Sequence, residues 1–242
     1  NAVVLDERLT DKNYYHLRNT RKAHYELNKE AQDHVKSLIY TYGGVSAGYY
    51  NDIGGYIVHT KGGDATYYYP QATFGMVSHA VCIIGWDDNY PKENFQRVPP
   101  GNGAFLCKNS WGEVKGDNGV ESNGFFWMSY YEQELCDVVA VEMDRGDVYA
   151  NMYSYGVAGN GDSIGDRAAN LNIFTAKAYG KGAVEKVDGV MVYLEESTGY
   201  KLTLYLEPEI KDGKIIGYKG KSKTFTGTSD YEGFYTIDTS SD

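Results

Sequence analysis

Two stretches in the middle of this sequence decide its fold class. The first reads Ser78-His79-Ala80-Val81-Cys82-Ile83-Ile84-Gly85-Trp86. The second reads Ala104-Phe105-Leu106-Cys107-Lys108-Asn109-Ser110-Trp111-Gly112. A short, nearly continuous apolar run is typical of a strand covered on both faces, so the first stretch predicts such a strand over 80–86. The second predicts a strand over 104–108, and a polar loop over 87–103 connects the two.

A helix and further strands are expected around this pair. Apolar residues recur at helical spacing over 28–42, which predicts an amphipathic helix; they are Ala31, Val35, Leu38, Ile39 and Tyr42. Asn28 is the expected N-cap and Gly43-Gly44 the expected stop. Strands are predicted over 45–50, 125–131 and 138–143, whereas 1–27 is polar without clear periodicity. One helix with later antiparallel strands indicates an α+β fold.

The pattern changes after about Gly146. Short segments there alternate apolar and polar residues between turn residues; they are Val187–Glu195, Tyr200–Glu207, Ile215–Lys219 and Phe234–Asp238. Short strands at this spacing favour a β-sandwich. We therefore expect a boundary near 144–150 and two domains, 1–145 and 146–242.

Composition excludes several classes of protein. With 42% hydrophobic and 23% charged residues, the chain is not disordered as a whole. A net charge of −10 disfavours nucleic acid as a partner. No apolar run approaches the roughly 18 residues that span a membrane. Three cysteines, an odd number, argue against a disulfide framework.

His79 and Asn109 are the candidate catalytic residues. His79 opens one predicted strand and Asn109 ends the next, so antiparallel pairing would bring them together. An imidazole beside a thiol stabilises the thiolate, and an amide oxygen can orient the other ring nitrogen. The indole of Trp111 could keep water from their hydrogen bond. The pattern is therefore typical of thiol-dependent catalysis.

These residues resemble the papain-like cysteine peptidases. The resemblance covers roughly 28–143 and rests on His79-Ala80-Val81, Lys108–Gly112 and Tyr42–Ser46, where Gly44 replaces the family's proline. It implies the C-terminal, mainly antiparallel half of a papain-like domain. It also implies protein or peptide substrates, hydrolysed through a Cys-His-Asn site.

The resemblance carries roles for individual residues. It implies that His79 is the general base and acid, Asn109 its orienter, and Trp111 a shield and leaving-side subsite. Gly44, Val45 and Ala80 would line the pocket for the residue that precedes the scissile bond.

Two further segments point to a narrower group. Ile83–Tyr90 and Ala169–Ala176 resemble bacterial cell-surface peptidases of this family that carry a lectin-like β-sandwich after the catalytic domain. The resemblance implies that 146–242 is a lectin-like sandwich, expected to be incomplete. It also implies a secreted or cell-surface location.

The chain departs from the family at the nucleophile. The family's catalytic cysteine lies upstream of the histidine, yet no cysteine precedes His79. A strand thiol such as Cys82 or Cys107 would be buried, with a raised pKa and poor access, so we interpret both as core residues. Cys136 is expected to be a free thiol in a linking segment. The chain is thus expected to be a fragment, inactive alone, whose Cys-bearing half could be a separate docked chain.

A second function from another class stays open. The chain could be a non-catalytic cell-surface module that contacts glycan or cell-wall polymer through its β-sandwich. Tyr67–Tyr69 and Tyr130-Tyr131 could stack on sugars, or could be strand and core aromatics. Oxygen-bearing side chains over 159–166 weakly suit calcium, or form a plain turn. No other metal or cofactor is expected.

Overall fold

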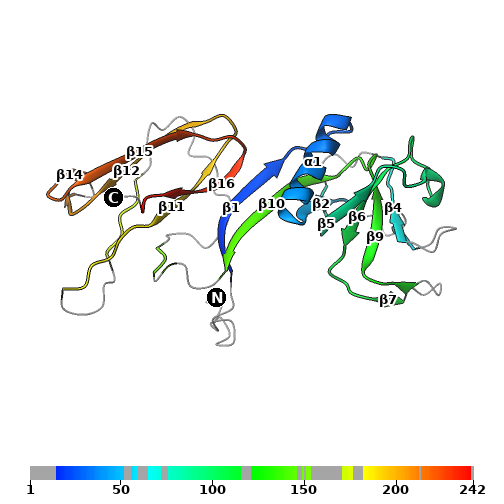
Figure 1. Ribbon diagram of the computed structural model, residues 1–242, viewed down its shortest axis with the longest axis horizontal. Coiled ribbons are helices and arrows are strands. Elements are labelled where there is room, and N and C mark those ends of the chain that lie inside the picture. The colour runs from blue at the N-terminus through cyan, green and yellow to red at the C-terminus, as the bar shows by residue number, and fades with distance from the viewer. Residues whose placement is uncertain are drawn as a thin grey trace.

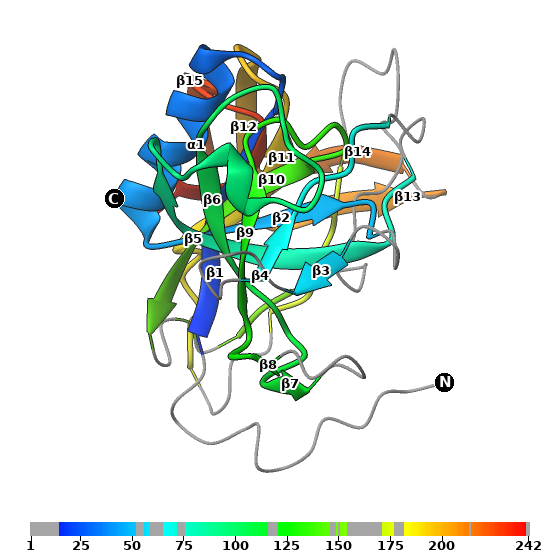
Figure 2. The same cartoon turned by 90° about the vertical axis from the view of Figure 1, so that its right-hand side faces the viewer.

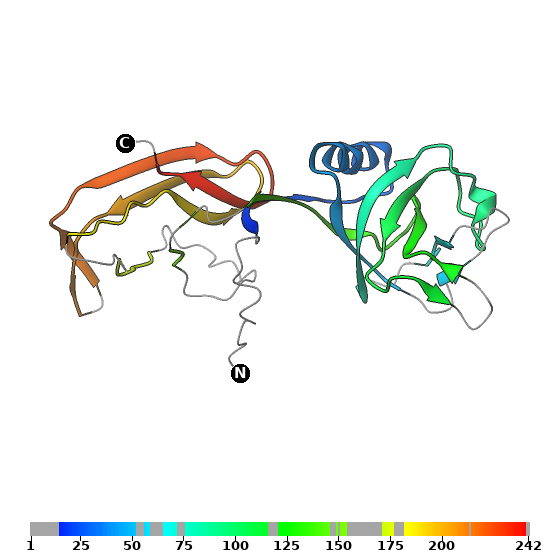
Figure 3. The same cartoon turned by 60° about the horizontal axis from the view of Figure 1, so that its bottom comes forward.

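The computed structural model describes residues 15–51, 56–58, 65–71, 76–115, 121–145, 149, 151–153, 171–176, 182–212 and 214–240. These residues form two lobes that two long strands connect (Figure 1). Figure 3 shows the narrow waist between the lobes, which β1 and β10 cross.

The first lobe is built on an eight-stranded sheet in the order β1-β10-β2-β5-β6-β9-β4-β3. The strands are β1 (Tyr15–Ala23), β2 (Val45–Tyr49), β3 (Tyr56–Val58), β4 (Ala65–Tyr67), β5 (His79–Asp87), β6 (Ala104–Lys108), β9 (Phe125–Ser129) and β10 (Cys136–Arg145). Neighbouring strands are antiparallel except the parallel pair β4 and β9. Figure 2 views this lobe end-on, with the short pair β7 (Val114–Lys115) and β8 (Glu121–Ser122) below the sheet.

Helix α1 (Lys29–Tyr42) begins and ends as predicted. The Asn28 side chain accepts a hydrogen bond from Ala31 N, and Gly43 adopts the left-handed conformation that closes the helix. The expected apolar face is buried through Ala31, Val35, Leu38 and Ile39. A mostly β fold with one α-helix among the described residues confirms the α+β prediction at this level.

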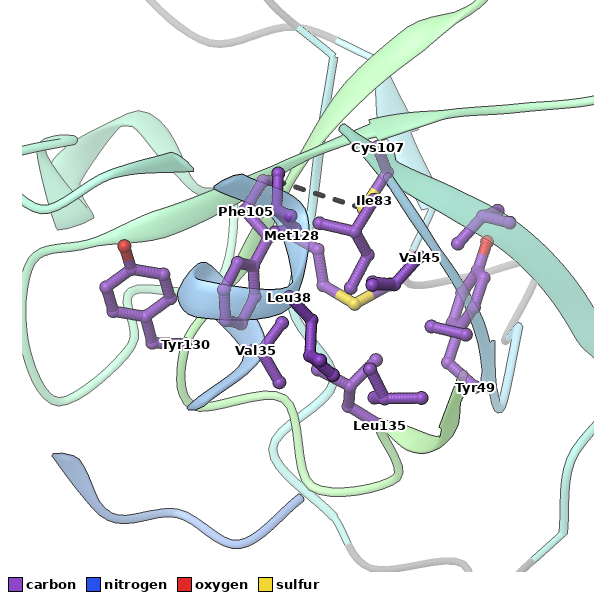
Figure 4. Packing of buried hydrophobic residues seen from close by; sticks show 14 of the residues in the cluster. Val35, Leu38, Val45, Tyr49, Ile83, Phe105, Cys107, Met128, Tyr130 and Leu135 are labelled. Atoms are coloured by element: carbon purple, nitrogen blue, oxygen red, sulfur yellow. Dashed lines mark hydrogen bonds between the residues drawn. The ribbon is translucent and has the colours of Figure 1, made fainter. Parts of the chain in front are cut away.

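The core of the first lobe lies between α1 and the sheet (Figure 4). Fully buried side chains from the helix, β2, β5, β6 and β9 meet there, among them Val35, Tyr49, Ile83, Phe105, Phe126 and Met128. This packing holds β5 and β6 against the helix; β5 begins and β6 ends at the candidate site.

Two expectations about the strands were wrong. Strand β5 is not covered on both faces: Val81 and Ile83 are buried, whereas Ala80 and Trp86 are exposed. Apolar residues therefore occur on both faces of β5, although only one face is buried. Strand β1 was missed within the polar segment 1–27, because it is an edge strand that pairs only with β10 within the sheet and buries little beyond Ala23.

The second lobe is a set of nested antiparallel pairs. They are β11 (Gly189–Leu194) with β16 (Gly233–Asp238), β12 (Gly199–Tyr205) with β15 (Ser222–Thr228), and β13 (Pro208–Lys211) with β14 (Lys214–Tyr218). The four strands predicted after residue 146 are all present. Most of their apolar side chains alternate between half-buried and exposed positions, so this lobe has a shallow core.

Strand β16 docks on the free edge of β1. Lys22 N donates to Glu232 O at 2.8 Å, and Phe234 N donates to the Thr20 hydroxyl at 2.9 Å. The Arg21 guanidinium lies 4.7 Å from the Tyr42 ring centroid and 4.4 Å from that of Tyr231. The lobes are thus joined by a main-chain hydrogen bond, a hydrogen bond from main chain to side chain, and a cation held between two aromatic rings.

Gly233 sets how closely β16 approaches β1. Its φ is 153°, and a Cβ at this position would lie 2.0 Å from Thr20 O. We predict that Gly233→Ala lowers the free energy of unfolding by roughly 1–3 kcal/mol, through backbone strain and the forced separation of the strands. Chemical denaturation measures this. Gly199→Ala is the control, because nothing lies within 4 Å of a Cβ there; equal losses in both variants would contradict the prediction.

Glu132 is a fully buried carboxyl in the first lobe. Its oxygens accept hydrogen bonds from Tyr69 N at 2.8 Å and Glu134 N at 3.4 Å. Burial away from water raises its pKa to about 7. The folded state therefore binds a proton at Glu132 more tightly than the unfolded chain does.

This burial predicts a pH dependence of stability. The contribution of Glu132 to the free energy of unfolding is fully present below about pH 4.5. It is lost as the pH rises through about 7, a change of about 3 kcal/mol. Glu132→Gln should flatten the decline in unfolding free energy between these pH values, as measured by urea denaturation. The exposed Glu113→Gln serves as control. An unchanged slope in Glu132→Gln would refute the assignment.

Candidate active site

The sheet brings His79 and Asn109 together as predicted. His79 is the first residue of β5, and Asn109 directly follows β6, its antiparallel neighbour. The His79 Nε2 atom lies 3.0 Å from Asn109 Oδ1. Asn109 is 6% exposed, so this hydrogen bond forms largely away from water.

The surrounding hydrogen bonds determine which nitrogen of His79 carries the proton. Ser110 N donates to Asn109 Oδ1 at 2.8 Å, so the amide atom that faces His79 is an oxygen. An oxygen only accepts, so His79 Nε2 must donate. In the neutral ring, Nδ1 is then left with the lone pair that can accept a proton.

Two aromatic rings hold the imidazole plane. The Trp111 ring lies 4.6 Å from the His79 ring at 31°, and Tyr49 contacts it edge-on at 5.6 Å. Tyr49 is buried, whereas Trp111 is 47% exposed and forms the outer side of this arrangement. Sequence reasoning singled out Trp111 and missed Tyr49, whose position opposite His79 follows from the β2–β5 register.

Backbone contacts fix both ends of the pair. Asn109 N donates to Gly124 O at 2.8 Å, which ties the loop after β6 to the start of β9. Ser78 N donates to Tyr49 O at 3.2 Å, and Ser78 Oγ accepts from Asn51 N at 2.9 Å. Gly112, directly after Trp111, adopts the left-handed conformation at φ 67° that glycine accepts without strain.

The residues predicted to line a substrate pocket do not all meet. Ala80 is exposed beside His79 and lies opposite Gly48. Val45 is 1% exposed, opposite Ile83 in the core, and Gly44 lies against Cys82 and Ile83. The structure thus places Gly44 and Val45 farther along β5, away from Ala80.

Other residues stand beside Ala80. A Cβ on Gly48 would lie 2.9 Å from Val77 Cγ1 and 3.5 Å from Cys136 Sγ, so these side chains occupy the space above Gly48. Sequence analysis missed Gly48, Val77 and Cys136 because their proximity depends on strand register and on a β-bulge at Asp137.

None of the three cysteines, all free thiols, is hydrogen-bonded to His79. Cys107 is fully buried and Cys82 half-buried, and desolvation raises the pKa of both. Cys136 is the first residue of β10, not part of a linking segment as expected. Strand β2 separates it from β5, about 10 Å across the sheet, and burial also raises its pKa. All three side chains therefore favour the neutral thiol, which is a weaker nucleophile than the thiolate.

The structure gives little support to the other candidate sites. Within the described residues, no cluster of three or more His, Cys, Asp or Glu side chains could hold a metal ion. The segment 159–166, considered for calcium, lies outside the described residues. Tyr67, Tyr68 and Tyr130 are at most 7% exposed, which supports their interpretation as core aromatics.

A His–Asn hydrogen bond, largely buried and lying under an indole, thus forms where the antiparallel neighbours β5 and β6 begin and end. The model of the family described as "Papain family cysteine protease" matches residues 7–144, more than half of the 242 residues. The chain belongs to the papain family.

Two solved structures are similar over most of this chain. The clostridial cysteine protease Cwp84 after propeptide cleavage is 26% identical with a TM-score of 0.66, covering 93% of this chain and 52% of its own. The cysteine protease and lectin-like domains of Cwp84, a surface-layer-associated protein of Clostridium difficile, are 25% identical with a TM-score of 0.63, covering 93% and 46%. The chain thus spans about half the length of these structures.

A comparison with curated proteins gave no match. Among the helices of the described residues, none is long and apolar enough to cross a membrane.

The hydrogen bond between His79 and Asn109 predicts one tautomer of the neutral imidazole. Long-range ¹H–¹⁵N correlation spectra should show the proton on Nε2 in the wild type and a mixture of tautomers in Asn109→Ala. Asn89→Ala, an exposed position, should leave the spectrum unchanged. A wild-type ring protonated on Nδ1 would contradict the geometry.

Proposed function

We propose that this chain carries the His–Asn side of a papain-family endopeptidase site, whose nucleophilic thiol comes from polypeptide that these 242 residues do not include. The observation that carries the proposal is the His79–Asn109 hydrogen bond of 3.0 Å, which leaves Nδ1 as acceptor. The raised pKa values of Cys82, Cys107 and Cys136 support a nucleophile from elsewhere.

The reaction follows from the position of that acceptor. His79 Nδ1 takes the proton of the incoming thiol, and the thiolate attacks the carbonyl carbon of a peptide bond. The imidazolium then gives its proton to the leaving amine as the C–N bond breaks, which leaves a thioester. Next, His79 deprotonates water, which attacks the thioester and releases the carboxylic acid and the thiol.

Asn109 and Trp111 act through His79 in this scheme. The amide oxygen holds the ring so that Nδ1 faces the substrate throughout both proton transfers. The indole covers one face of the ring, excludes water from the hydrogen bond and contacts the leaving side of the substrate.

We further propose that the residue before the scissile bond rests on Ala80. Gly48 and Val77 extend this surface, and both offer apolar atoms beside Ala80. An apolar side chain of the substrate fits such a surface, because its burial there removes apolar area from water. In this proposal Gly44 and Val45 do not contact the substrate but support this surface from the backbone and the core behind it.

The cellular location is proposed from the relative. Cwp84 is named as a surface-layer-associated protein. By analogy, we propose that this chain belongs to a protein that is secreted or held on a bacterial cell surface.

A quenched fluorescent peptide library tests the site assignment. The chain alone should show no turnover. The natural protein that contains both these residues and a cysteine-bearing segment should cleave peptides, and thiol alkylation should stop it. In that protein, His79→Ala should lower kcat by about 100-fold to 10,000-fold, since proton transfer is lost.

His34→Ala, on the exposed side of α1, is the matched control and should retain activity. Turnover that survives His79→Ala would refute the assignment. The chain alone could also show turnover that disappears in Cys136→Ser. That result would place the nucleophile within the chain and overturn the proposal that the thiol comes from elsewhere.

A further inference from the structure

A cavity lies between the two lobes, and none of the residues that line it belongs to the site around His79. It is partly open to solvent and has a volume of about 410 Å³, within the size of ligand-binding pockets, roughly 300–1,000 Å³. Its lining residues are Arg18, Asp144, Tyr149, Asp188, Thr236, Asp238 and Ser240.

Both lobes contribute to the wall. Arg18 and Asp144 come from the paired strands β1 and β10, and the Arg18 guanidinium lies 3.6 Å from the Asp144 carboxylate. Thr236 of β16 is bound to the opposite strand, because its hydroxyl donates to Arg18 O. The cavity is therefore built where β16 docks on β1.

The second-lobe side of the wall is held by main-chain bonds. Thr239 N donates to Asp188 O at 3.0 Å, and Ser240 N donates to the Asp238 carboxylate at 2.8 Å. The bonds from Ser240 keep the pKa of Asp238 below its usual value, so this carboxylate stays ionised near neutral pH. Its position relative to Asp188 is thus set by the backbone.

Tyr149 reaches this wall next to the start of β11. A Cβ on Gly189 would lie 3.0 Å from Thr236 Cγ2 and 3.5 Å from the Tyr149 hydroxyl. The tight neighbour of this position is Thr236, whereas the Tyr149 hydroxyl lies at an ordinary contact distance from β11. Tyr149 brings to the wall an apolar ring with a polar tip, a combination that suits sugars.

The charges limit which ligand this cavity can take. Among the described lining residues, three carboxylates stand against one guanidinium, a balance that disfavours phosphate and carboxylate ligands. The carboxylates do not converge on one point, since no metal-binding cluster forms among the described residues. Separate acceptors, with donors from Arg18 and the hydroxyls, match a neutral ligand that offers several hydroxyl groups.

We propose that this interlobe cavity binds a saccharide. Asp188 and Asp238 accept hydrogen bonds from ring hydroxyls, Arg18 donates to a ring or hydroxyl oxygen, and Tyr149 contacts the sugar face. Because the wall comes from both lobes, a bound saccharide links the second lobe to the family domain. The site is independent of the proposed peptidase chemistry and does not need the missing thiol.

Saturation-transfer NMR and calorimetry with the full chain test this proposal. The probes are the methyl glycosides of glucose, galactose, mannose and N-acetylglucosamine. We expect saturable binding of at least one probe with a Kd on the order of 1 mM or tighter. Asp188→Asn and Asp238→Asn should each weaken it about tenfold, because each removes a charged acceptor at constant size.

Asp212→Asn is the matched control. It lies at the β13–β14 turn with φ 52°, a conformation that asparagine tolerates, and it should bind like the wild type. Circular dichroism establishes that each variant is folded.

Three outcomes would overturn the proposal. They are no binding by any probe, equal binding by wild type and both cavity variants, and binding of putrescine in place of sugars. The last outcome would assign the carboxylates to an organic cation.

Discussion

The antiparallel pairing of β5 with β6 is the constraint on which the site depends. It brings the start of one strand beside the end of the other, and so sets His79 Nε2 3.0 Å from Asn109 Oδ1. The pairing is held in place by the core, because Ile83 and Phe105 are fully buried on the face that α1 covers. The hydrogen bond between His79 and Asn109, at the ends of two inner strands, is thus supported by apolar packing in the interior of the lobe.

The same sheet explains how two lobes form one molecule. Strand β10 pairs with β2 on one side and with β1 on the other, and β1 in turn accepts β16 on its free edge. An edge strand exposes unpaired main-chain groups, which here bind the second lobe. The chain belongs to the papain family through its first lobe, and the interlobe cavity exists because β16 docks on β1.

Local patterns predicted much of this fold. The helix was predicted from the spacing of its buried residues and from its two caps, Asn28 and Gly43. Capping and amphipathicity act over a few neighbouring positions, so a local pattern reveals them. Strand β1 was missed, since an edge strand that buries little carries no apolar alternation. Strand β5 was expected to be covered on both faces, but an apolar composition does not reveal that Ala80 and Trp86 are exposed. Gly44, Val45 and Ala80 were expected to line one pocket; the register sets Gly48 opposite Ala80 and Val45 opposite Ile83.

The sequence by itself determined which chemical groups are available: an imidazole at a strand start, an amide and an indole after the next strand, and no cysteine upstream. These are properties of residue type and order. Only the tertiary structure decided which groups meet, which His79 nitrogen carries the proton, that Tyr49 supports the ring and that a polar cavity lies where the lobes dock. Strand register and lobe docking arise from contacts between residues far apart in the chain, and a one-residue shift would turn every side chain to the other face.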